Sequence, residues 1–279
     1  MRLTIFGAGG LLGKALMRGQ IGDELTGLRA KDADIRDAAQ VERAVAASRP
    51  DWIILAAAYT DVDGCEANPD LAFDVNCRGA VNIAQAAKQH GARLLFISTD
   101  YVFDGNKTTP YEADDARNPQ SVYGKSKAQA EVELLQIVPE VCILRTSWLF
   151  GPDGKCFPET ILKLAGTRKE LDVVDDQRGS PTYSVDLARA LAEVCRNRVS
   201  GIVHATNRGD CSWFEFAQAI VSEAGLPTAI RPVSSAQFVR PARRPKYSVL
   251  SARSLEEYGI VMPGWRDALG RYLKLRSSA

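Results

Sequence analysis

The sequence lacks long hydrophobic runs and any excess of charge of one sign. No stretch reaches the roughly 18 apolar residues of a membrane-spanning helix. The N-terminus enters an apolar segment directly after Met1 and Arg2, which is not a signal-peptide pattern. The 35 basic and 34 acidic residues leave a formal net charge of +1, which argues against a general nucleic-acid binder. We therefore expect a cytoplasmic protein that binds neither membranes nor nucleic acids.

Residues that hold metals are also scarce. His90 and His204 are the two histidines, too few for a usual zinc site, and the six cysteines are scattered without a Cys-x-x-Cys spacing. We predict no metal site, and we expect reduced cysteines that serve packing or lie at the surface. The 46% hydrophobic content over 279 residues is enough for one large domain or one and a half.

Apolar, β-branched runs alternate with helical patterns along the chain. The expected strands lie at residues 2–6, 25–29, 51–58, 93–98, 141–147 and 201–206, and the expected helices at 12–19, 38–48, 69–90, 121–136 and 184–197. This alternation predicts an α/β fold, a Rossmann-type doubly wound parallel sheet with helices on both faces. We assign residues 1–150 to a dinucleotide-binding domain to which 184–206 return. Residues 151–183 and 207–279 are expected to form a smaller C-terminal substrate-binding lobe.

A glycine-rich turn follows the first expected strand. Gly7, Gly10 and Gly13 form a Gly-x-x-Gly-x-x-Gly pattern between a strand and a helix, which is typical of a dinucleotide-binding loop. Gly7 permits the tight turn, Gly10 lets the backbone approach a pyrophosphate, and Gly13 allows close packing of helix on strand. The other loop residues that we expect at the cofactor are Gly9, Leu11 and Leu12.

The end of the second expected strand bears on the choice of cofactor. NAD-specific sheets usually carry an acidic residue there, which binds the ribose hydroxyls. Here Arg29 stands at this place and Lys31 follows it. A planar guanidinium suits the oxygens of a 2′-phosphate. We predict a preference for NADPH with NADH possibly accepted; the alternative is an exposed arginine without a ligand.

A pattern typical of carbonyl reduction follows the run that ends near residue 98. Ser98 and Thr99 end this strand, and Tyr123 and Lys127 follow at a spacing that places both on one face of a helix. A lysine one turn from a tyrosine, together with a nicotinamide, lowers the pKa of the phenol and prepares it to donate a proton to a carbonyl. Thr99 or Ser98 would hydrogen-bond the same oxygen. The alternative is a surface lysine beside a half-buried tyrosine, with the two hydroxyls as strand caps.

Sequence blocks along nearly the whole chain resemble the extended short-chain dehydrogenase/reductase family and, within it, the dTDP-4-dehydrorhamnose reductases. The blocks lie, in family order, at residues 7–13, 34–35, 56–66, 76, 98–105, 123–127, 145–148, 176–182 and 244–245. The resemblance implies reduction of the 4-keto group of dTDP-4-dehydro-6-deoxy-L-mannose to dTDP-L-rhamnose by NAD(P)H. This is a step of dTDP-rhamnose biosynthesis.

The resemblance also implies roles for individual residues. Thr99, Tyr123 and Lys127 match the catalytic triad of the family, and Tyr123 and Lys127 also contact the cofactor. The further cofactor contacts that it implies are Asp34, Ile35, Ala56, Ala57, Ala58, Tyr59 and Asn76. The substrate contacts that it implies are Thr60, Val62, Asp63, Ser98, Thr99, Tyr101, Trp148 and Arg244.

Two departures and two alternatives bear on this interpretation. Related 4,6-dehydratases carry an acidic residue where this chain has Tyr101, so we expect reduction rather than dehydration. Lys14 and Ala15 stand where some relatives carry metal-bridging carboxylates, so monomer and homodimer both stay open. The alternatives are another nucleotide-sugar reductase or epimerase of the family, and a non-catalytic NADP-binding regulatory subunit similar to that of methionine adenosyltransferase.

Overall fold

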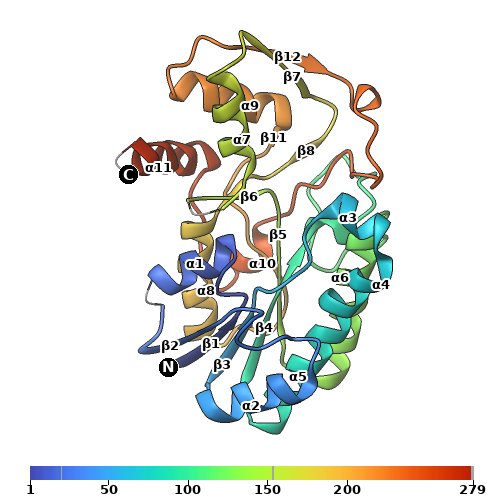
Figure 1. Ribbon diagram of the computed structural model, residues 1–279, viewed down its shortest axis with the longest axis vertical. Helices are drawn as coiled ribbons and strands as arrows, with labels where there is room; N and C mark the ends of the chain where they lie inside the picture. Colours follow the sequence, from blue (N-terminus) through green and yellow to red (C-terminus); the bar gives the residue numbers. More distant parts are fainter. Residues whose placement is uncertain (20, 153, 278–279) are drawn as a thin grey trace.

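A six-stranded parallel sheet forms the lower half of the molecule in Figure 1, in the order β10-β5-β4-β3-β1-β2. This computed structural model describes residues 1–279 apart from 20, 153, 278 and 279. The strands are β1 (Arg2–Phe6), β2 (Glu24–Leu28), β3 (Trp52–Leu55), β4 (Arg93–Thr99), β5 (Cys142–Thr146) and β10 (Gly201–His204). Each falls on an expected strand, and all neighbours pair in parallel, so the predicted fold class is confirmed.

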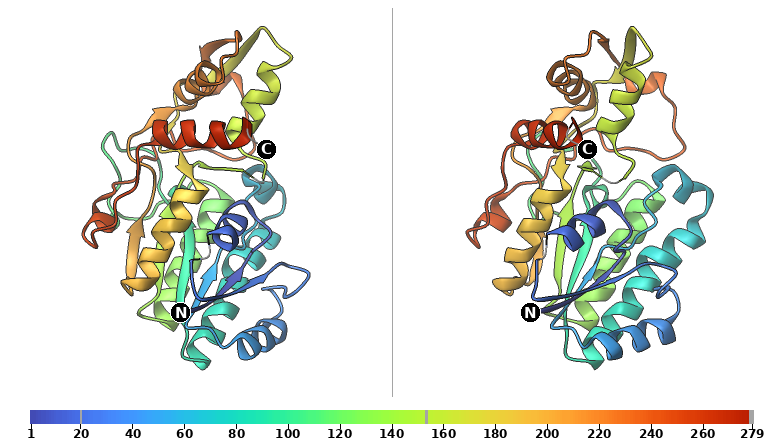
Figure 2. Two further views of the ribbon diagram at one scale, coloured as in Figure 1. Left: turned by 90° about the vertical axis from the view of Figure 1, so that its left-hand side faces the viewer. Right: turned by 60° about the vertical axis from the view of Figure 1, so that its left-hand side comes forward.

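Helices cover both faces of this sheet (Figures 1 and 2). The helices of one face are α1 (Leu11–Arg18) and α8 (Ser184–Arg196), and those of the other are α2 (Ala38–Ser48), α5 (Gly79–Gln89) and α6 (Val122–Ile137). Ile53 belongs to the buried cluster under the second face and Ile54 to the cluster under the first. Successive side chains of a strand point to opposite faces, which is why a strand covered on both sides is apolar throughout.

The remaining elements interrupt or follow this alternation. The expected helix at 69–90 is divided into α4 (Pro69–Phe73), the π-helical turn η1 (Asp74–Arg78) and α5. The others are α3 (Val62–Ala67), η2 (Asp100–Val102), β6 (Leu149–Phe150), α7 (Phe157–Ala165), β7 (Glu170–Val174), β8 (Arg178–Gly179), β9 (Thr182–Tyr183), β11 (Cys211–Ser212), α9 (Trp213–Glu223), β12 (Ala229–Val233), η3 (Ser235–Gln237), α10 (Arg253–Glu256) and α11 (Trp265–Ser277).

The upper half of Figure 1 has a core of its own. Phe150, Phe216 and Trp265 are buried in it, between α7, α9 and α11. By contrast, α10 packs on β10, and Leu255 and Met262 join the core of the sheet. The sequence assigned this segment to the later lobe; the structure places it with the sheet, because its apolar residues cover the end strand β10. We accordingly propose the upper half, without α10, as the substrate-binding lobe.

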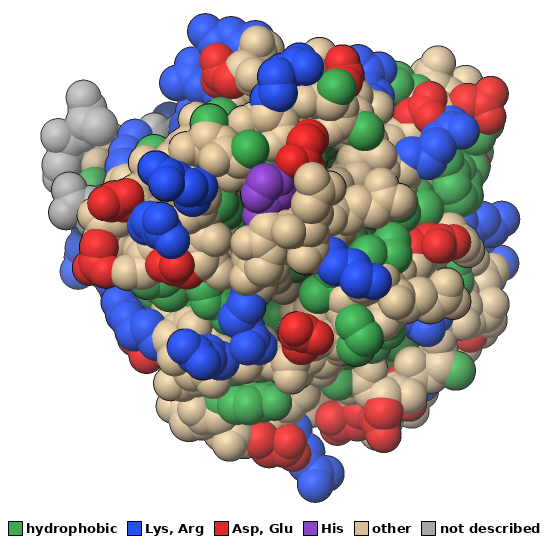
Figure 3. Space-filling view, turned by 90° about the horizontal axis from the view of Figure 1, so that it is seen from below, with side chains coloured by type: hydrophobic (Ala, Val, Ile, Leu, Met, Phe, Trp, Pro, Cys, Tyr) green, Lys and Arg blue, Asp and Glu red, His purple; other side chains and the backbone are tan. Residues whose placement is uncertain are grey.

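The carboxyl ends of β1, β3, β4 and β5 face this upper lobe, and the loops that leave them meet at one edge. Thr99 at the end of β4 pairs in register with Thr146 at the end of β5. The opposite, lower end carries basic and acidic side chains interspersed (Figure 3). Within the described residues, no helix is long and apolar enough to cross a membrane.

Candidate active site

The glycine-rich loop after β1 is packed too closely for side chains. Gly7 adopts a φ of +93°, and a Cβ on it would lie 2.5 Å from the backbone nitrogen of Ala57. A Cβ on Gly13 would lie 2.1 Å from the carbonyl oxygen of Gly7. Gly10, the N-cap of α1, has no side chain to accept from the first amides of the helix. Those amides and the helix dipole fit the pyrophosphate of a dinucleotide.

Arg29 lies beside this loop, directly after β2. Its Cγ is 3.5 Å from the place that a Cβ on Gly9 would take. The side chain is exposed, and no ion pair engages its guanidinium within the described part of the chain. Arg29 is therefore positioned to meet a phosphate that approaches the loop.

The residues expected at the adenine are held by their neighbours. Asp34 accepts from Arg36 Nε at 3.0 Å and from Nη2 at 2.6 Å, and these hydrogen bonds lower the pKa of its carboxyl. Ile35 is buried, and a Cβ on Gly79 would lie 2.7 Å from its side chain. The Asp34 carboxylate is thus already paired, which leaves Ile35 as an apolar wall.

Asn76 holds the loop after β3 in place. The residues of this loop that we expect to contact the cofactor or the substrate are Ala56, Ala57, Ala58, Tyr59 and Thr60. Asn76 Oδ1 accepts from Tyr59 N at 2.8 Å. Its Nδ2 donates to Tyr59 O at 3.1 Å and to Ser126 Oγ of α6 at 3.0 Å. Both amide protons are thus used inside the protein, so Asn76 acts here by positioning the loop rather than by donating to a cofactor.

Three contacts fix the start of α6, which carries Tyr123 and Lys127. Ser121 caps the helix by accepting from Gly124 N at 3.1 Å. Glu66 of α3 accepts from Val122 N at 2.8 Å. A Cβ on Gly124 would lie 2.2 Å from the carbonyl oxygen of Tyr101, so only glycine lets α6 approach η2 this closely.

Lys127 is almost completely buried, with 2% of its surface exposed. Its ammonium lies 3.8 Å from the centroid of the Phe96 ring, a cation–π contact. Burial lowers the pKa of Lys127 to about 7, although the negative charge of Glu131, one turn further along α6, acts in the opposite direction. The lysine is therefore poised to change its protonation state near neutral pH.

Tyr123 packs edge-on against Tyr101, with the ring centroids 5.6 Å apart. Burial raises the pKa of the Tyr123 phenol, while a hydrogen bond with Thr99 lowers it and the charge of Asp100 raises it further. Lys127 by itself does not bring this pKa toward neutrality, and the joint effect of lysine and nicotinamide stays a prediction. Burial outweighs other influences on the phenol and also weakens the charge on the lysine.

Thr99 and Ser98 face opposite sides of β4. Thr99 Oγ1 accepts from Tyr101 N at 3.2 Å and donates to Asp100 Oδ1 at 3.0 Å. Ser98 Oγ donates to Glu131 Oε1 at 2.6 Å. The prediction of Ser98 as a substrate contact is corrected here: neighbouring strand residues point to opposite faces, so Ser98 turns into the interior while Thr99 turns to Tyr123.

Glu131 gathers a buried cluster of charges behind the site. Arg145 donates to it from Nε at 2.9 Å and from Nη2 at 2.7 Å, and Arg117 Nη1 donates at 3.1 Å. Burial raises the pKa of Glu131, but these partners and Ser98 outweigh it and hold the pKa below its usual value. Our sequence analysis missed this residue, although its four-residue spacing from Lys127 was a usable signal.

An aromatic stack borders the site on the lobe side. Trp148 has a φ of +46° and lies parallel to Trp213, with the ring centroids 3.4 Å apart and the planes at 7°. A Cβ on Gly179 would lie 2.6 Å from the Trp148 ring. The sequence singled out Trp148 alone; no local pattern connects it with Trp213, which starts α9.

Arg244 and Asp63 join the two halves of the molecule. Arg244 Nη1 and Nη2 donate to Asp63 Oδ1 at 2.9 Å and to Oδ2 at 2.8 Å. Ala242 N adds a hydrogen bond to Oδ1 at 3.1 Å. Of the other two predicted substrate contacts nearby, Thr60 is exposed and Val62 is the first residue of α3. Asp63 and Arg244, both predicted as substrate contacts, therefore bind each other. Arg244 could bind a diphosphate only if it contacted Asp63 at the same time or released it.

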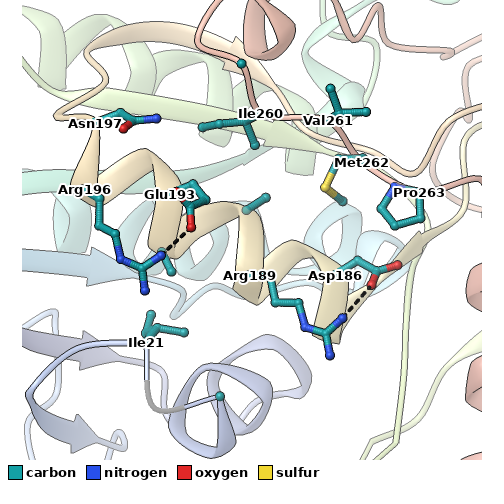
Figure 4. A pocket seen from close by; sticks show the side chains of 14 residues that line it. Ile21, Asp186, Arg189, Glu193, Arg196, Asn197, Ile260, Val261, Met262 and Pro263 are labelled. Atoms are coloured by element: carbon teal, nitrogen blue, oxygen red, sulfur yellow. Dashed lines mark hydrogen bonds and ion pairs between the residues drawn. The ribbon is translucent and has the colours of Figure 1, made fainter.

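A separate pocket lies between α8 and residues 259–263 (Figure 4). Arg189 and Arg196 border it, each paired with an acidic residue of α8. None of the predicted site residues lines it.

The sequence and the fold of this chain both match known proteins. The model of the family described as RmlD substrate binding domain matches residues 1–277. The spore coat polysaccharide biosynthesis protein SpsK of Bacillus subtilis is 45% identical over 280 residues, which cover 100% of this chain and 99% of that protein. A dTDP-4-dehydrorhamnose reductase of Mycobacterium tuberculosis is 44% identical, with 98% of this chain and 92% of the relative covered. The crystal structure of the dTDP-4-dehydrorhamnose reductase of Bacillus anthracis in complex with NADP superposes with a TM-score of 0.95 at 39% identity, covering 98% of this chain and 99% of that one.

Proposed function

This chain belongs to the RmlD substrate binding domain family, and from that membership and the site geometry we propose that it is an NADPH-dependent dTDP-4-dehydrorhamnose reductase. It would reduce the 4-keto group of dTDP-4-dehydro-6-deoxy-L-mannose and form dTDP-L-rhamnose. The full-length match to reductases of this name supports the substrate, and the related structure with NADP supports the cofactor. The six cysteines are free and buried, which supports a reducing, cytoplasmic setting.

The residues at the edge of the sheet fit a dinucleotide. The amides that follow Gly10 would hold the pyrophosphate, Ile35 would pack on the adenine, and Arg29 would pair with the 2′-phosphate. The loop that Asn76 fastens would line the nicotinamide side. When bound, NADPH supplies a hydride to the carbonyl carbon of the sugar.

Tyr123 supplies the proton that completes the reduction. A raised phenol pKa keeps it protonated at neutral pH until the substrate oxygen gains charge. The transfer remains downhill, because an alkoxide is about as basic as hydroxide, whose parent water has a pKa of about 15.7. A tyrosine with this pKa therefore suits reduction, in which the enzyme must hold a proton rather than accept one.

Lys127 and Thr99 position the reacting groups. Lys127, held on Phe96 one turn below Tyr123, would bind the ribose hydroxyls and help to return a proton to the phenol. Thr99 would donate a hydrogen bond to the carbonyl oxygen as negative charge develops there. Trp148, backed by Trp213 and Gly179, would pack on the apolar face of the deoxysugar.

The observation that carries the proposal is the hydrogen bond of Thr99 with Tyr123, one helical turn from Lys127, at the sheet edge that also carries a glycine loop without room for side chains. The test follows NADPH oxidation at 340 nm on addition of the enzymatically generated dTDP-4-keto sugar. We expect turnover by the wild type and a loss of about 10² or more in Y123F, the scale of positioned acid catalysis.

The variant Y258F removes a phenol from an exposed tyrosine just after α10 and serves as the matched control. Wild-type protein that binds NADPH but leaves the keto sugar unchanged would favour a non-catalytic regulatory subunit. Y123F with nearly full activity would remove Tyr123 from the role of proton donor.

A further inference from the structure

The proton of Thr99 points away from the place where the reaction needs it. A hydroxyl has one proton to donate and two lone pairs with which to accept. In the structure the Thr99 proton goes to Asp100 Oδ1 at 3.0 Å, and one lone pair accepts from Tyr101 N at 3.2 Å. The remaining lone pair can only accept, and the phenol of Tyr123, with which Thr99 also hydrogen-bonds, is the donor beside it. In this state Thr99 has no proton for the carbonyl oxygen of a substrate.

Asp100 occupies an unusual position for a carboxyl group. It starts η2, only 2% of its surface is exposed, and its Oδ2 is buried without a hydrogen-bond partner in the described chain. Ser248, from the segment after β12, donates to the same carboxyl, and burial raises the pKa of Asp100 to about 6. A buried acceptor without a partner costs free energy in the ionised form, and protonation relieves that cost.

Hydrogen bonds around Asp100 compensate its negative charge only in part, because burial outweighs them. Thr99 and Ser248 offer neutral hydroxyls. The ionisable groups that face it are Tyr101 on its own segment and Tyr123 from α6, and burial raises the pKa of both phenols. The backbone amides of Asp100 and Tyr101 add two further neutral donors, and the largest influences on the pKa of Asp100 include no cation.

We propose that Asp100 is a positioning residue that sets the direction of the Thr99 hydrogen bond: the protonated carboxyl donates to Thr99 Oγ1, and Thr99 then donates to the carbonyl oxygen of the substrate. In this state every donor and acceptor position of the Thr99 hydroxyl has a partner. Thr99 accepts from Tyr101 N–H and from Asp100 O–H, while Tyr123 turns its proton from Thr99 to the substrate, so the Thr99 proton is free for the same substrate oxygen. This inference rests on the proposed reductase function.

The protonation of Asp100 does not change the stoichiometry of the reduction. The hydride comes from NADPH, the proton in the product comes from Tyr123, and the proton of Asp100 is not consumed. Ionisation of Asp100 reverses the Thr99 hydrogen bond and withdraws one donor from the developing oxyanion. Loss of one such donor lowers kcat by about 10²–10³ in other enzymes, so the effect is large enough to measure.

The experiment compares the pH profiles of kcat for the wild type and D100N between pH 5.5 and 8.5, with saturating NADPH and keto sugar. The amide of D100N has the shape of a protonated carboxyl and donates to Thr99 at every pH. We expect wild-type kcat to decline above about pH 6. The ratio of D100N to wild-type kcat should rise at least tenfold between pH 6 and pH 8.

Two further variants separate this role from a structural one. In a T99V background, D100N should no longer alter the pH profile, because the hydroxyl that it directs is absent. S248A removes a donor to the Asp100 carboxylate, so the wild-type decline should move to higher pH. S248A also keeps the proposal testable if D100N does not fold.

Identical pH declines in wild type and D100N would overturn the proposal, and so would a 100-fold loss in folded D100N at every pH. If D100N does not fold, an unshifted decline in S248A overturns it. A wild type without reductase activity at any pH would instead refute the proposed function, so the two failures are distinguishable.

Discussion

At the scale of single residues, burial decides the protonation behaviour of this site. The pKa of Lys127 falls to about 7 because its ammonium loses water, and the face of Phe96 and the charge of Glu131 do not make up for that loss. The same loss of water raises the pKa of Tyr123. At neutral pH the phenol is therefore protonated and the lysine only partly charged, rather than an ammonium beside a phenolate.

Arg29 is the residue on which cofactor choice is expected to depend. R29A removes the guanidinium beside Gly9, and one charge-assisted hydrogen bond contributes about 1.5–3 kcal/mol. We expect the wild type to prefer NADPH over NADH roughly tenfold to a hundredfold in kcat/KM, and R29A to lose most of that ratio. Steady-state kinetics with both cofactors measure it.

The control is R43A, which removes another exposed arginine near the end of β2, on α2. An NADH-preferring wild type, or an unchanged ratio in R29A, would exclude Arg29 from binding a 2′-phosphate.

At the scale of elements, the pairing of α6 with β5 depends on buried charges rather than on apolar contacts alone. Glu131 of α6 has no exposed surface and accepts from Arg145 of β5 and Ser98 of β4. A helix fastened in this way cannot rotate about its axis, and its rotation sets where Tyr123 and Lys127 point. The cluster thus links the packing of the sheet to the placement of the reacting groups.

Removal of Glu131 tests this link. E131A leaves the Arg145 guanidinium buried without its carboxylate, which should lower the free energy of unfolding by about 3–5 kcal/mol. E131Q keeps an acceptor for Ser98 and should cost less. Urea denaturation followed by circular dichroism measures both.

Glu133 lies two residues further on the same helix and accepts a hydrogen bond from Gln129 at the surface, so E133A serves as control and should change stability by less than about 0.5 kcal/mol. An E131A protein as stable as E133A would show that apolar packing alone holds α6 in place.

At the scale of the whole molecule, residues 242–250 connect the lobe with the sheet. Arg244 and Ala242 bind Asp63 of α3, and Ser248 N donates to Arg178 O at 2.8 Å. A Cβ on Gly105 would lie 2.6 Å from Pro245, so the segment also presses on the loop after η2. The segment therefore borders the site on the side expected to hold the nucleotide sugar.

D63N should loosen this connection without unfolding the protein. The side chains of Asp63 and Arg244 are 24% and 22% exposed, so the pair contributes about 1 kcal/mol to stability. We expect KM for the nucleotide sugar to rise about threefold to tenfold, because the segment must then be ordered on binding. The KM for NADPH should stay within about twofold.

R231Q breaks a surface ion pair with Asp172 at the far end of the lobe and should leave both KM values unchanged. An equal rise of both KM values in D63N would indicate general damage and would contradict the assigned role of the segment.

Local patterns in the sequence determined the class of fold and the cofactor loop. Apolar runs of strand length alternate with helical periods, and the spacing of apolar residues along a segment decides which kind of element can bury them. Gly7, Gly10 and Gly13 lie within seven residues, and Tyr123 and Lys127 within one helical turn. Because these groups are neighbours along the chain, their geometry follows from the backbone of one element.

Tertiary structure alone decided the electrostatics and the partners of the site. Arg244 binds Asp63 across a separation of 181 residues, and Trp213 stacks on Trp148 from another lobe. The same packing turns Ser98 to Glu131 and buries Asp100 beside Thr99. A pKa depends on the water and charge that surround a group, and a hydrogen-bond direction depends on which partner holds the proton. The pKa values and the hydrogen-bond directions of the site are therefore set only when segments distant in the sequence pack around the same residues.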